Sequence, residues 1–204
     1  LLTLAVEYGH KNVVDMLIAR PELDLNAVSE NWFTALLSAV AIEREDIVKS
    51  FFGQPSLKIN HCAGKNKLTA FSIVMLRAND TLAILFLNHS QFDLSVHAAY
   101  DQSIMAMCSR LPDCEAIFTA CMEKYKTLEP AKRHDILGAA KAGSIVLCGA
   151  ASYGTVKMVD VLLKQNVQLY VSENQYLQTP LIAAVVSERD SLDKVKQIVA
   201  YSRD

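Results

Sequence analysis

Thiols, imidazoles and clustered carboxylates are the side chains of this sequence that could do chemistry. His61 adjoins Cys62, and an imidazole that activates a thiol makes a cysteine nucleophile. Such a dyad usually joins residues far apart in the sequence, because neighbours on a turn rarely direct their side chains at each other. Both residues are therefore expected to be structural, and a cysteine-dependent enzyme is the weaker hypothesis.

The other polar groups have plainer interpretations. His97 and Asp101 flank a turn, where a local hydrogen bond accounts for them. Carboxylates gather at residues 43–46 and 188–190, and each cluster precedes an expected helix, whose first turn favours negative charge. We expect solvated charges at both places rather than a catalytic acid and base.

No motif for a metal, a cofactor or a disulfide framework is present. The sequence has no G-x-G-x-x-G, no H-E-x-x-H and no C-x-x-C pattern, and its number of cysteines is odd. We therefore predict no catalytic residue, no cofactor and no metal ligand. Free thiols that pack as small apolar groups fit a reducing cytosol. The cysteines are Cys62, Cys108, Cys114, Cys121 and Cys148.

Composition limits the kinds of partner. The chain has 204 residues, of which 51% are hydrophobic, and its mean hydropathy is +0.19, as expected of a folded protein. A net charge of −2 argues against binding to nucleic acid or anionic lipid, which attract basic surfaces. The sequence shows no signal-peptide pattern and no apolar run near the ~18 residues of a membrane span. We expect a cytoplasmic monomer that binds neither nucleic acid nor membrane.

The stretch 145–163 indicates which elements carry these residues. It contains two short apolar helices separated at Gly154. The second helix places Met158, Val159 and Leu162 on one stripe with helical spacing. Helices this short need similar neighbours on both sides, so the chain is expected to repeat.

Copies of this unit recur at a spacing of about 34 residues. Thr34, Thr69 and Ser103 stand at equivalent places, and an apolar stripe with a similar ending follows each. The stripes lie at residues 13–18, 47–52, 82–87, 116–121 and 158–163, and the endings at 24–26, 58–60, 93–95, 127–129 and 168–170.

The repeated pattern resembles the ankyrin repeat, which reads T-P-L-H-x-A-A-x-x-G-H, then V-V-x-x-L-L, then a D-V-N-like ending. Residues 4–10 with 13–18, residues 150–154 and Thr179-Pro180-Leu181 match it best. The resemblance covers the whole chain and implies an all-α ankyrin-repeat solenoid of about six helix-turn-helix units with finger-like connecting loops. The units of this single domain are predicted at 1–26, 27–60, 61–95, 96–129, 143–170 and 171–204, with a longer, basic connection at 130–142.

Several departures from the family pattern carry expectations. Trp32 stands where the family usually has Gly, because that position favours a conformation costly to a residue with a Cβ. The His of T-P-L-H is replaced in every unit, so the stack must rely on apolar packing, and unit 96–129 is expected to be the least stable. Lys194 and Lys196 suggest a last helix with one wet face, as in a capping repeat. The connection is expected to hold an extra turn of helix.

The resemblance also implies a function, since ankyrin domains generally act as non-enzymatic scaffolds that bind a partner protein on their concave finger and inner-helix face. Aromatic and Arg side chains dominate interface energetics. We expect Trp32 to fold back onto the neighbouring repeat, because an indole is seldom left fully wet. The predicted partner-binding residues are Tyr8, Phe33, Ile42, Asn66, Arg77, Tyr100, Arg110, Tyr153 and Tyr176.

Other functions stay open. The domain could be the interaction or spacer part of a multidomain enzyme whose catalytic part lies elsewhere, since Leu1 stands where the first helix should already be under way and a fragment of a longer protein is expected. The basic connection either meets an acidic partner or is a solvated loop. Endings such as Phe92-Asp93-Leu94 look similar to ankyrin proteins of host-associated microbes, for which the host cytosol would be the location.

Overall fold

The computed structural model describes residues 1–97, 102–138, 140–165, 167 and 179–202. The chain forms two compact units: unit 1 is Leu1–Asp93, and unit 2 is Leu94–His97 together with Gln102–Asp204. In the described ranges the units consist of helices and turns, with isolated β-bridges in place of strands. Among these residues no helix has the length and apolar character needed to cross a membrane. The predicted all-α class is confirmed.

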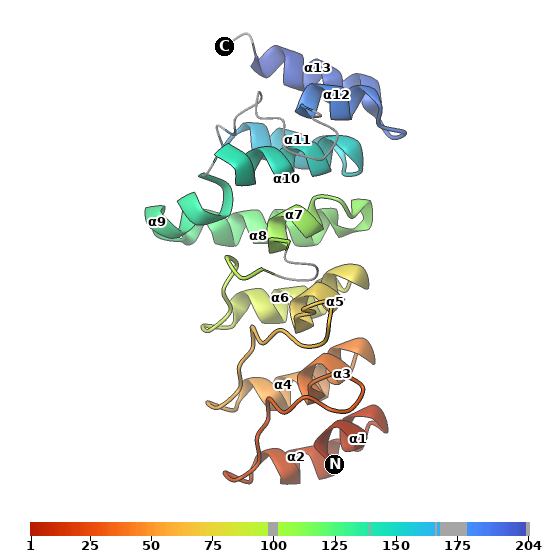
Figure 1. Ribbon diagram of the computed structural model, residues 1–204, viewed down its shortest axis with the longest axis vertical. Helices are drawn as coiled ribbons and strands as arrows, with labels where there is room; N and C mark the ends of the chain where they lie inside the picture. Colours follow the sequence, from red (N-terminus) through yellow and green to blue (C-terminus); the bar gives the residue numbers. More distant parts are fainter. Residues whose placement is uncertain (98–101, 139, 166, 168–178, 203–204) are drawn as a thin grey trace. The chain divides into compact units, whose positions relative to one another are not determined.

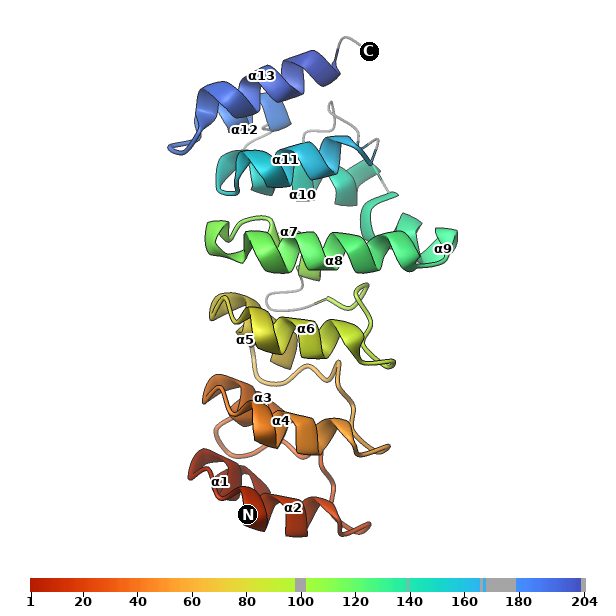
Figure 2. The same cartoon turned by 180° about the vertical axis from the view of Figure 1, so that it is seen from behind.

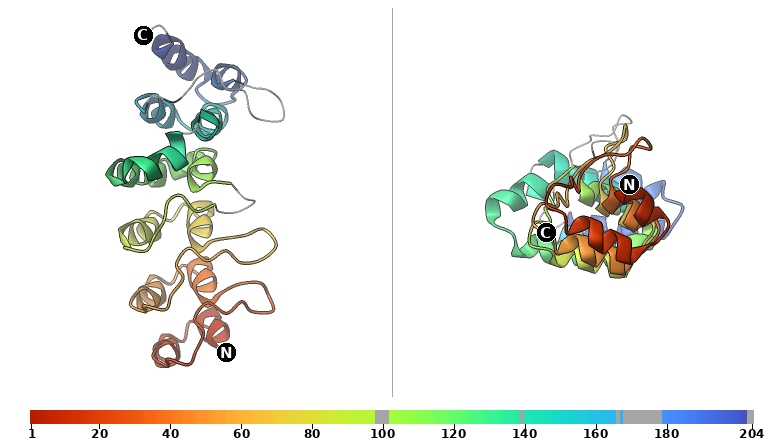
Figure 3. Two further views of the ribbon diagram at one scale, coloured as in Figure 1. Left: turned by 60° about the vertical axis from the view of Figure 1, so that its left-hand side comes forward. Right: turned by 90° about the horizontal axis from the view of Figure 1, so that it is seen from below.

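Unit 1 consists of helix pairs arranged in two rows. The inner row is α1, α3 and α5, and the outer row is α2, α4 and α6 (Figures 1 and 2). Each inner helix packs against its outer partner and against the next inner helix of the unit. The connecting loops project from the inner row, away from the outer row (Figure 3). The bounds are α1 Leu2–Glu7, α2 Lys11–Ile18, α3 Ala35–Ala41, α4 Glu45–Phe52, α5 Ala70–Leu76 and α6 Asp80–Asn88.

The inner helices of unit 1 end in one common geometry. A left-handed residue follows the C-cap of each, namely Gly9 (φ 68°), Glu43 (φ 55°) and Ala78 (φ 49°). The next backbone N–H donates to the carbonyl five residues earlier, at 2.9, 3.1 and 3.2 Å respectively. This Schellman closure turns the chain sharply into the outer helix. Two of the three closures tolerate a Cβ in a conformation that glycine adopts more readily.

Two asparagines link the successive pairs of unit 1 in the same way. The Asn26 side chain accepts from Lys58 N at 2.7 Å and donates to Ser56 O at 2.9 Å. The Asn60 side chain repeats both bonds one pair later, to the backbone of residues 91–93, at 2.7 and 3.2 Å. The predicted endings at 24–26 and 58–60 thus hold the asparagines that tie one ending to the next.

Aromatic side chains fill the core between the second and third pairs. Phe52 and Phe86 meet edge to face at 4.9 Å, and Phe71 lies 4.7 Å from Phe92. Phe71 and Phe86 are essentially inaccessible to solvent. These rings supply the apolar packing that the sequence requires in place of the missing histidine.

Unit 2 also stacks helix pairs, α7 with α8, α10 with α11 and α12 with α13 (Figure 1). Within it α7, α10 and α12 pack in succession, and α11 packs against both α8 and α13. The bounds are α7 Ile104–Cys108, η2 Pro112–Cys114, α8 Glu115–Thr127, α9 Pro130–Arg133, η3 (a π-helical turn) His134–Gly138, α10 Ala140–Ser152, α11 Val156–Leu163, α12 Pro180–Val185 and α13 Ser191–Tyr201.

The connection after α8 is more ordered than a solvated loop. It contains α9 and the π-helical turn η3, and Ile136 and Leu137 on that turn are 2% and 4% exposed. The expected extra helix is therefore present, and its apolar side packs into unit 2. Helix α10 begins at Ala140, ahead of the predicted boundary at 143.

The stretch that predicted the repeat folds as expected. Met158, Val159 and Leu162 of α11 are fully buried. A Cβ placed on Gly154 would lie 2.8 Å from Ser109 O and 2.9 Å from the Ala150 backbone, so only glycine fits there. The close approach of the Ser109 carbonyl and of the last turn of α10, rather than a left-handed conformation, accounts for this glycine.

The last helix pair differs from the predicted polar cap. Lys194 does not face solvent: it is fully buried, and its Nζ donates to Ala151 O at 3.2 Å and to Ser187 Oγ at 3.0 Å. The prediction of a wet face was wrong for this residue, because the carbonyls at the end of α10 need a donor. Burial lowers the pKa of the Lys194 ammonium.

Candidate protein-binding surface

The residues that cap the inner helices of unit 1 form a repeated exposed set, which we call the inner column: Tyr8, Ile42 and Arg77. Each is the C-cap residue of its helix, and its backbone N–H donates to the carbonyl four residues earlier. Tyr8 is 75% exposed and Ile42 39%, and Arg77 is exposed. The shared closure therefore presents three of the predicted binding residues at equivalent places.

Two loops of unit 1 carry the predicted finger residues. Finger 1 (residues 28–33) is closed by Ser29 N donating to Phe33 O at 2.8 Å, and finger 2 (residues 62–68) by the bridge between Ala63 and Leu68. Phe33 is half-buried and Asn66 is exposed. Of this predicted pair, Asn66 is thus the more accessible to a partner.

Trp32 adopts the left-handed conformation that the family pattern requires, with φ 65°. Its side chain is 58% exposed, so the expectation that it folds back onto the neighbouring repeat was wrong. A Cβ on Gly64 would lie 3.5 Å from Trp32 Cβ, so the two fingers touch through backbone and Cβ and leave the indole outside. Trp32 therefore joins the candidate surface instead of packing on the neighbouring repeat as expected.

Two of the predicted binding residues lie among the described residues of unit 2. Tyr153, directly after α10, is 62% exposed. Arg110 is exposed, and its Nη1 donates to Gln102 Oε1 at 3.2 Å. Tyr100 and Tyr176 lie outside the described residues. Unit 2 thus exposes two of its predicted binding residues, an aromatic side chain and a cation.

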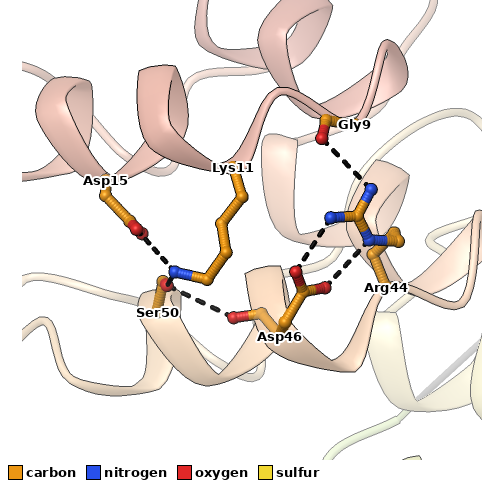
Figure 4. A network of polar contacts seen from close by, with 6 residues as sticks. All are labelled: Gly9, Lys11, Asp15, Arg44, Asp46 and Ser50. Carbon is orange, nitrogen blue, oxygen red and sulfur yellow. Dashed lines mark hydrogen bonds and ion pairs between the residues drawn. The ribbon is translucent and has the colours of Figure 1, made fainter.

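A polar network joins the first two helix pairs of unit 1 (Figure 4). The Arg44 guanidinium donates to both carboxylate oxygens of Asp46, at 2.9 and 2.8 Å, and to Gly9 O of the preceding pair at 3.1 Å. The hydrogen bond from Arg44 lowers the pKa of Asp46 to about 2. Gly9 has φ 68°, a conformation that glycine adopts readily, and a Cβ there would come 2.5 Å from Arg44 Nη1, so the Arg44 side chain would have to move.

Lys11 extends the same network on the outer row. Its ammonium pairs with Asp15 one turn along α2 and donates to Ser50 Oγ of α4 at 3.3 Å. The hydrogen bond from Lys11 is the main cause of the lowered pKa of Asp15. The sequence analysis expected solvated carboxylates here and did not predict these bonds. The alternation of charge at Arg44 and Asp46 could have indicated the ion pair.

Three of the thiols, Cys108, Cys114 and Cys121, are buried in unit 2, whereas Cys62 and Cys148 are half-buried. Burial raises the pKa of Cys121 to about 12, and that of Cys108 rises chiefly through its contact with Cys114. Cys62 donates to Asn60 O at 3.9 Å, a contact within its own turn. No cluster of three or more His, Cys, Asp or Glu side chains that could hold a metal ion occurs in the described ranges.

Comparison with known proteins identifies the repeat. A family model described as ankyrin repeats (many copies) matches residues 2–52, which are the first two helix pairs. No curated protein sequence matches this chain.

Solved structures extend the likeness to the full length. The ankyrin repeat domain of Bcl-3, described as a unique member of the IkappaB protein family, aligns with a TM-score of 0.75 at 18% identity, over 100% of this chain and 86% of that chain. A chain in the complex of Bd0816, a predatory endopeptidase from Bdellovibrio bacteriovorus, with the immunity protein Bd3460 aligns with a TM-score of 0.67 at 21% identity, over 96% of each chain. Residues 2–52 therefore match the ankyrin-repeat family by sequence, and the helix pairs of the chain have the ankyrin-repeat fold.

Proposed function

We propose that this chain is a non-enzymatic protein-binding module, and that its partner docks on the inner column and the two fingers of unit 1. The observation that carries the proposal is the inner column itself. A tyrosine, an isoleucine and an arginine stand at one repeated backbone position, exposed to solvent.

The chemistry of this surface suits a protein partner. Tyr8 and Trp32 offer large rings at a low cost in side-chain entropy, and Arg77 offers a planar donor. Such residues supply most of the affinity of protein interfaces, whereas a small-molecule site needs an enclosed pocket. Short helices packed in a stack hold these side chains at fixed spacing, so little order has to be gained on binding.

The comparisons support the kind of partner without naming it. One of the two similar structures is a complex between an endopeptidase and an immunity protein. We infer that this chain likewise acts by holding another protein. The reducing interior of a cell is the proposed setting, because the cysteines in the described ranges of both units are not joined in disulfides.

A comparison of two triple variants tests the proposal. The inner variant carries Tyr8→Ala, Ile42→Ala and Arg77→Ala, and the outer variant carries Asn12→Ala, Lys49→Ala and Ile84→Ala at exposed positions of α2, α4 and α6. The immobilised protein is used to capture partners from cell lysate, and the bound proteins are quantified by mass spectrometry. A true partner should be retained by the wild type and the outer variant and lost by at least tenfold with the inner variant, which corresponds to about 1.4 kcal/mol.

Circular dichroism should show the same helix content and melting temperature for both variants, because all the replaced side chains are exposed. A captured protein that all three forms retain equally would contradict the proposed surface.

A further inference from the structure

The third helix pair of unit 1 differs in charge from the rest of the chain. The sequence carries 22 acidic residues, yet none of them lies between Asp46 and Asp80, a stretch as long as one whole repeat. The cations of that stretch are Lys49, Lys58, Lys65, Lys67 and Arg77. Positive charge is therefore concentrated on one repeat of a chain whose net charge is −2.

Two of these cations are available to a partner. Lys65 on finger 2 and Arg77 on the inner column are exposed, and their side chains form no ion pair within the described ranges. Lys11, Arg44 and Lys49, in the first two pairs, each pair with a nearby carboxylate instead. A guanidinium without a carboxylate of its own chain is suited to bind one from another molecule, through two parallel hydrogen bonds.

Exposed apolar side chains of the second pair lie beside these two cations. Trp32 of finger 1 is 58% exposed, and a Cβ on Gly64, directly before Lys65, would lie 3.5 Å from Trp32 Cβ. Ile42 caps α3 and Arg77 caps α5, and these two helices pack against each other. On the fingers and on the inner column alike, an apolar side chain of the second pair is therefore next to a cation of the third.

The carboxylates of unit 1 determine which part of a partner suits which pair. Glu30 is half-buried on finger 1, and Glu43 is exposed directly after Ile42, so the second pair carries negative charge beside its apolar side chains. A partner carboxylate would be repelled there and attracted to the third pair. An apolar partner side chain would gain most on the second pair.

We propose that the second and third pairs of unit 1 bind an acidic segment of the partner protein. An apolar side chain of that segment packs on Trp32 or Ile42, and a carboxylate of the segment pairs with Lys65 or Arg77. Packed helices lie about 8–10 Å apart, and an extended chain covers this distance in about three residues. The segment therefore carries its acidic residue about three positions from its apolar one. This inference rests on the proposed function and names the class of partner.

The mixture of side chains favours a peptide over a phosphate polymer. Nucleic acids and anionic lipid surfaces bind a continuous basic surface, in which each cation neutralises a phosphate. Here the indole of Trp32 and the carboxylate of Glu43 lie between and beside the cations, which suits a ligand that alternates apolar and acidic groups.

Selection from a phage-displayed library of random peptides of about 12 residues, which span about 40 Å when extended, tests the proposal. The full chain is immobilised, and the enriched peptides are sequenced. They should be acidic on average, with Asp or Glu about three residues from an aliphatic or aromatic residue. A selection that enriches no peptide, or peptides without an excess of acidic residues, would overturn the proposal. If the enriched peptides were neutral or basic and still lost binding to the inner variant, the proposed surface would stand and only the acidic class would fail.

A matched pair of charge-reversal variants then locates the contact. Lys65→Glu with Arg77→Glu should weaken binding of the most enriched peptide by about tenfold or more, measured by fluorescence anisotropy at low salt. Arg20→Glu with Lys49→Glu makes the same change in net charge at exposed positions after α2 and on α4, and should bind as the wild type does. Circular dichroism checks that both variants are folded. Equal weakening by the two variants would overturn the assignment to the third pair.

Salt dependence and a competing polyanion complete the test. The affinity of the wild type for the peptide should fall between about 50 mM and about 500 mM NaCl, and the double variant at Lys65 and Arg77 should lose most of this dependence. An affinity that ignores salt would show that the carboxylates of the peptide do not meet these cations. A single-stranded oligonucleotide that binds more tightly than the peptide, and is lost with the same variant, would assign the cations to phosphate and overturn the proposal.

Discussion

In unit 1 the same polar contacts recur from one helix pair to the next, whereas the described residues of unit 2 join their pairs through contacts that change at every step. Asn26 and Asn60 make identical bonds, and three Schellman closures share one geometry. In unit 2, Glu115 accepts from Thr155 at 2.6 Å and pairs with Lys157, and buried Lys194 caps the end of α10. A repeat can therefore stack either through periodic backbone closures or through individual side chains.

The two means have different consequences for mutation. A periodic contact contributes a small amount several times, so one loss leaves its copies in place. A contact that occurs between only one helix pair and the next has no copy elsewhere that could compensate for its loss. We therefore expect the largest effects of single substitutions in unit 2.

Gly154→Ala is expected to have the largest effect. The added Cβ would lie 2.8 Å from Ser109 O and 2.9 Å from the Ala150 backbone, so the turn after α10 would have to shift away from both. We expect the free energy of unfolding to fall by about 3 kcal/mol, as for other overpacked sites. Urea denaturation followed by circular dichroism measures it.

Gly53→Ala in unit 1 is the matched control. Its Cβ would lie 3.6 Å from Ser50 O, an ordinary contact, and its φ of −74° suits any residue. The stability should stay the same or rise by about 0.5 kcal/mol. If both substitutions lowered the free energy of unfolding by the same amount, the expected contrast between unit 1 and unit 2 would be contradicted.

Lys194→Ala is expected to come next. It removes the donor to Ala151 O and Ser187 Oγ at a buried site, so we expect a loss of about 2 kcal/mol from unsatisfied groups and lost packing. Lys196→Ala, on the exposed side of α13 with an ion pair to Asp193, should cost less than about 0.5 kcal/mol. Thermal unfolding of both variants distinguishes a buried cap from a surface charge, and similar melting temperatures would refute the assigned role.

Asn60→Ala should cost less than either change in unit 2. It removes two backbone contacts at a partly exposed ending, so we expect a loss of about 1 kcal/mol. Asn26→Ala should cost about the same, since its contacts have the same pattern. Glu129→Ala, at the corresponding ending of unit 2, should have almost no effect. Chemical denaturation of the three variants would contradict the periodic interpretation if the two asparagines differed widely.

The sequence was sufficient for the parts of the fold that repeat. Hydrophobic spacing predicted the helix pairs and the buried stripe of α11, and the equivalence of Thr34, Thr69 and Ser103 predicted helix starts that the structure confirms. Repetition gives several independent observations of each position, so errors at one copy are corrected by the others.

The misjudged residues were those with no equivalent copy. Trp32 was expected to fold back onto the neighbouring repeat because an indole is seldom left fully wet, but at this left-handed position its side chain is 58% exposed. Lys194 was assigned to solvent from its charge, although it caps the carbonyls of α10. Composition cannot supply such information, because both placements depend on backbone direction at a single site. The lower stability expected for unit 96–129 stays a prediction.

The smallest expected effect is a pH dependence that compares one carboxylate in each unit. Asp46 has a pKa of about 2 when folded, below its ordinary 3.8, because Arg44 donates to it. Its stabilising contribution is therefore complete above about pH 4 and is lost as the pH falls toward 2. The pKa of Glu115 is also lowered from an ordinary 4.5, chiefly by the hydrogen bond from Thr155, so its contribution should begin to fall at a slightly higher pH.

Melting temperatures of Asp46→Asn and Glu115→Gln, measured from pH 7 to pH 2, should lie slightly below the wild type at neutral pH and converge with it in acid. The difference stays small because both side chains are partly exposed. A difference from the wild type that persists unchanged at pH 2 would show that the carboxylates act through shape rather than charge, and the two units would then be alike in this respect.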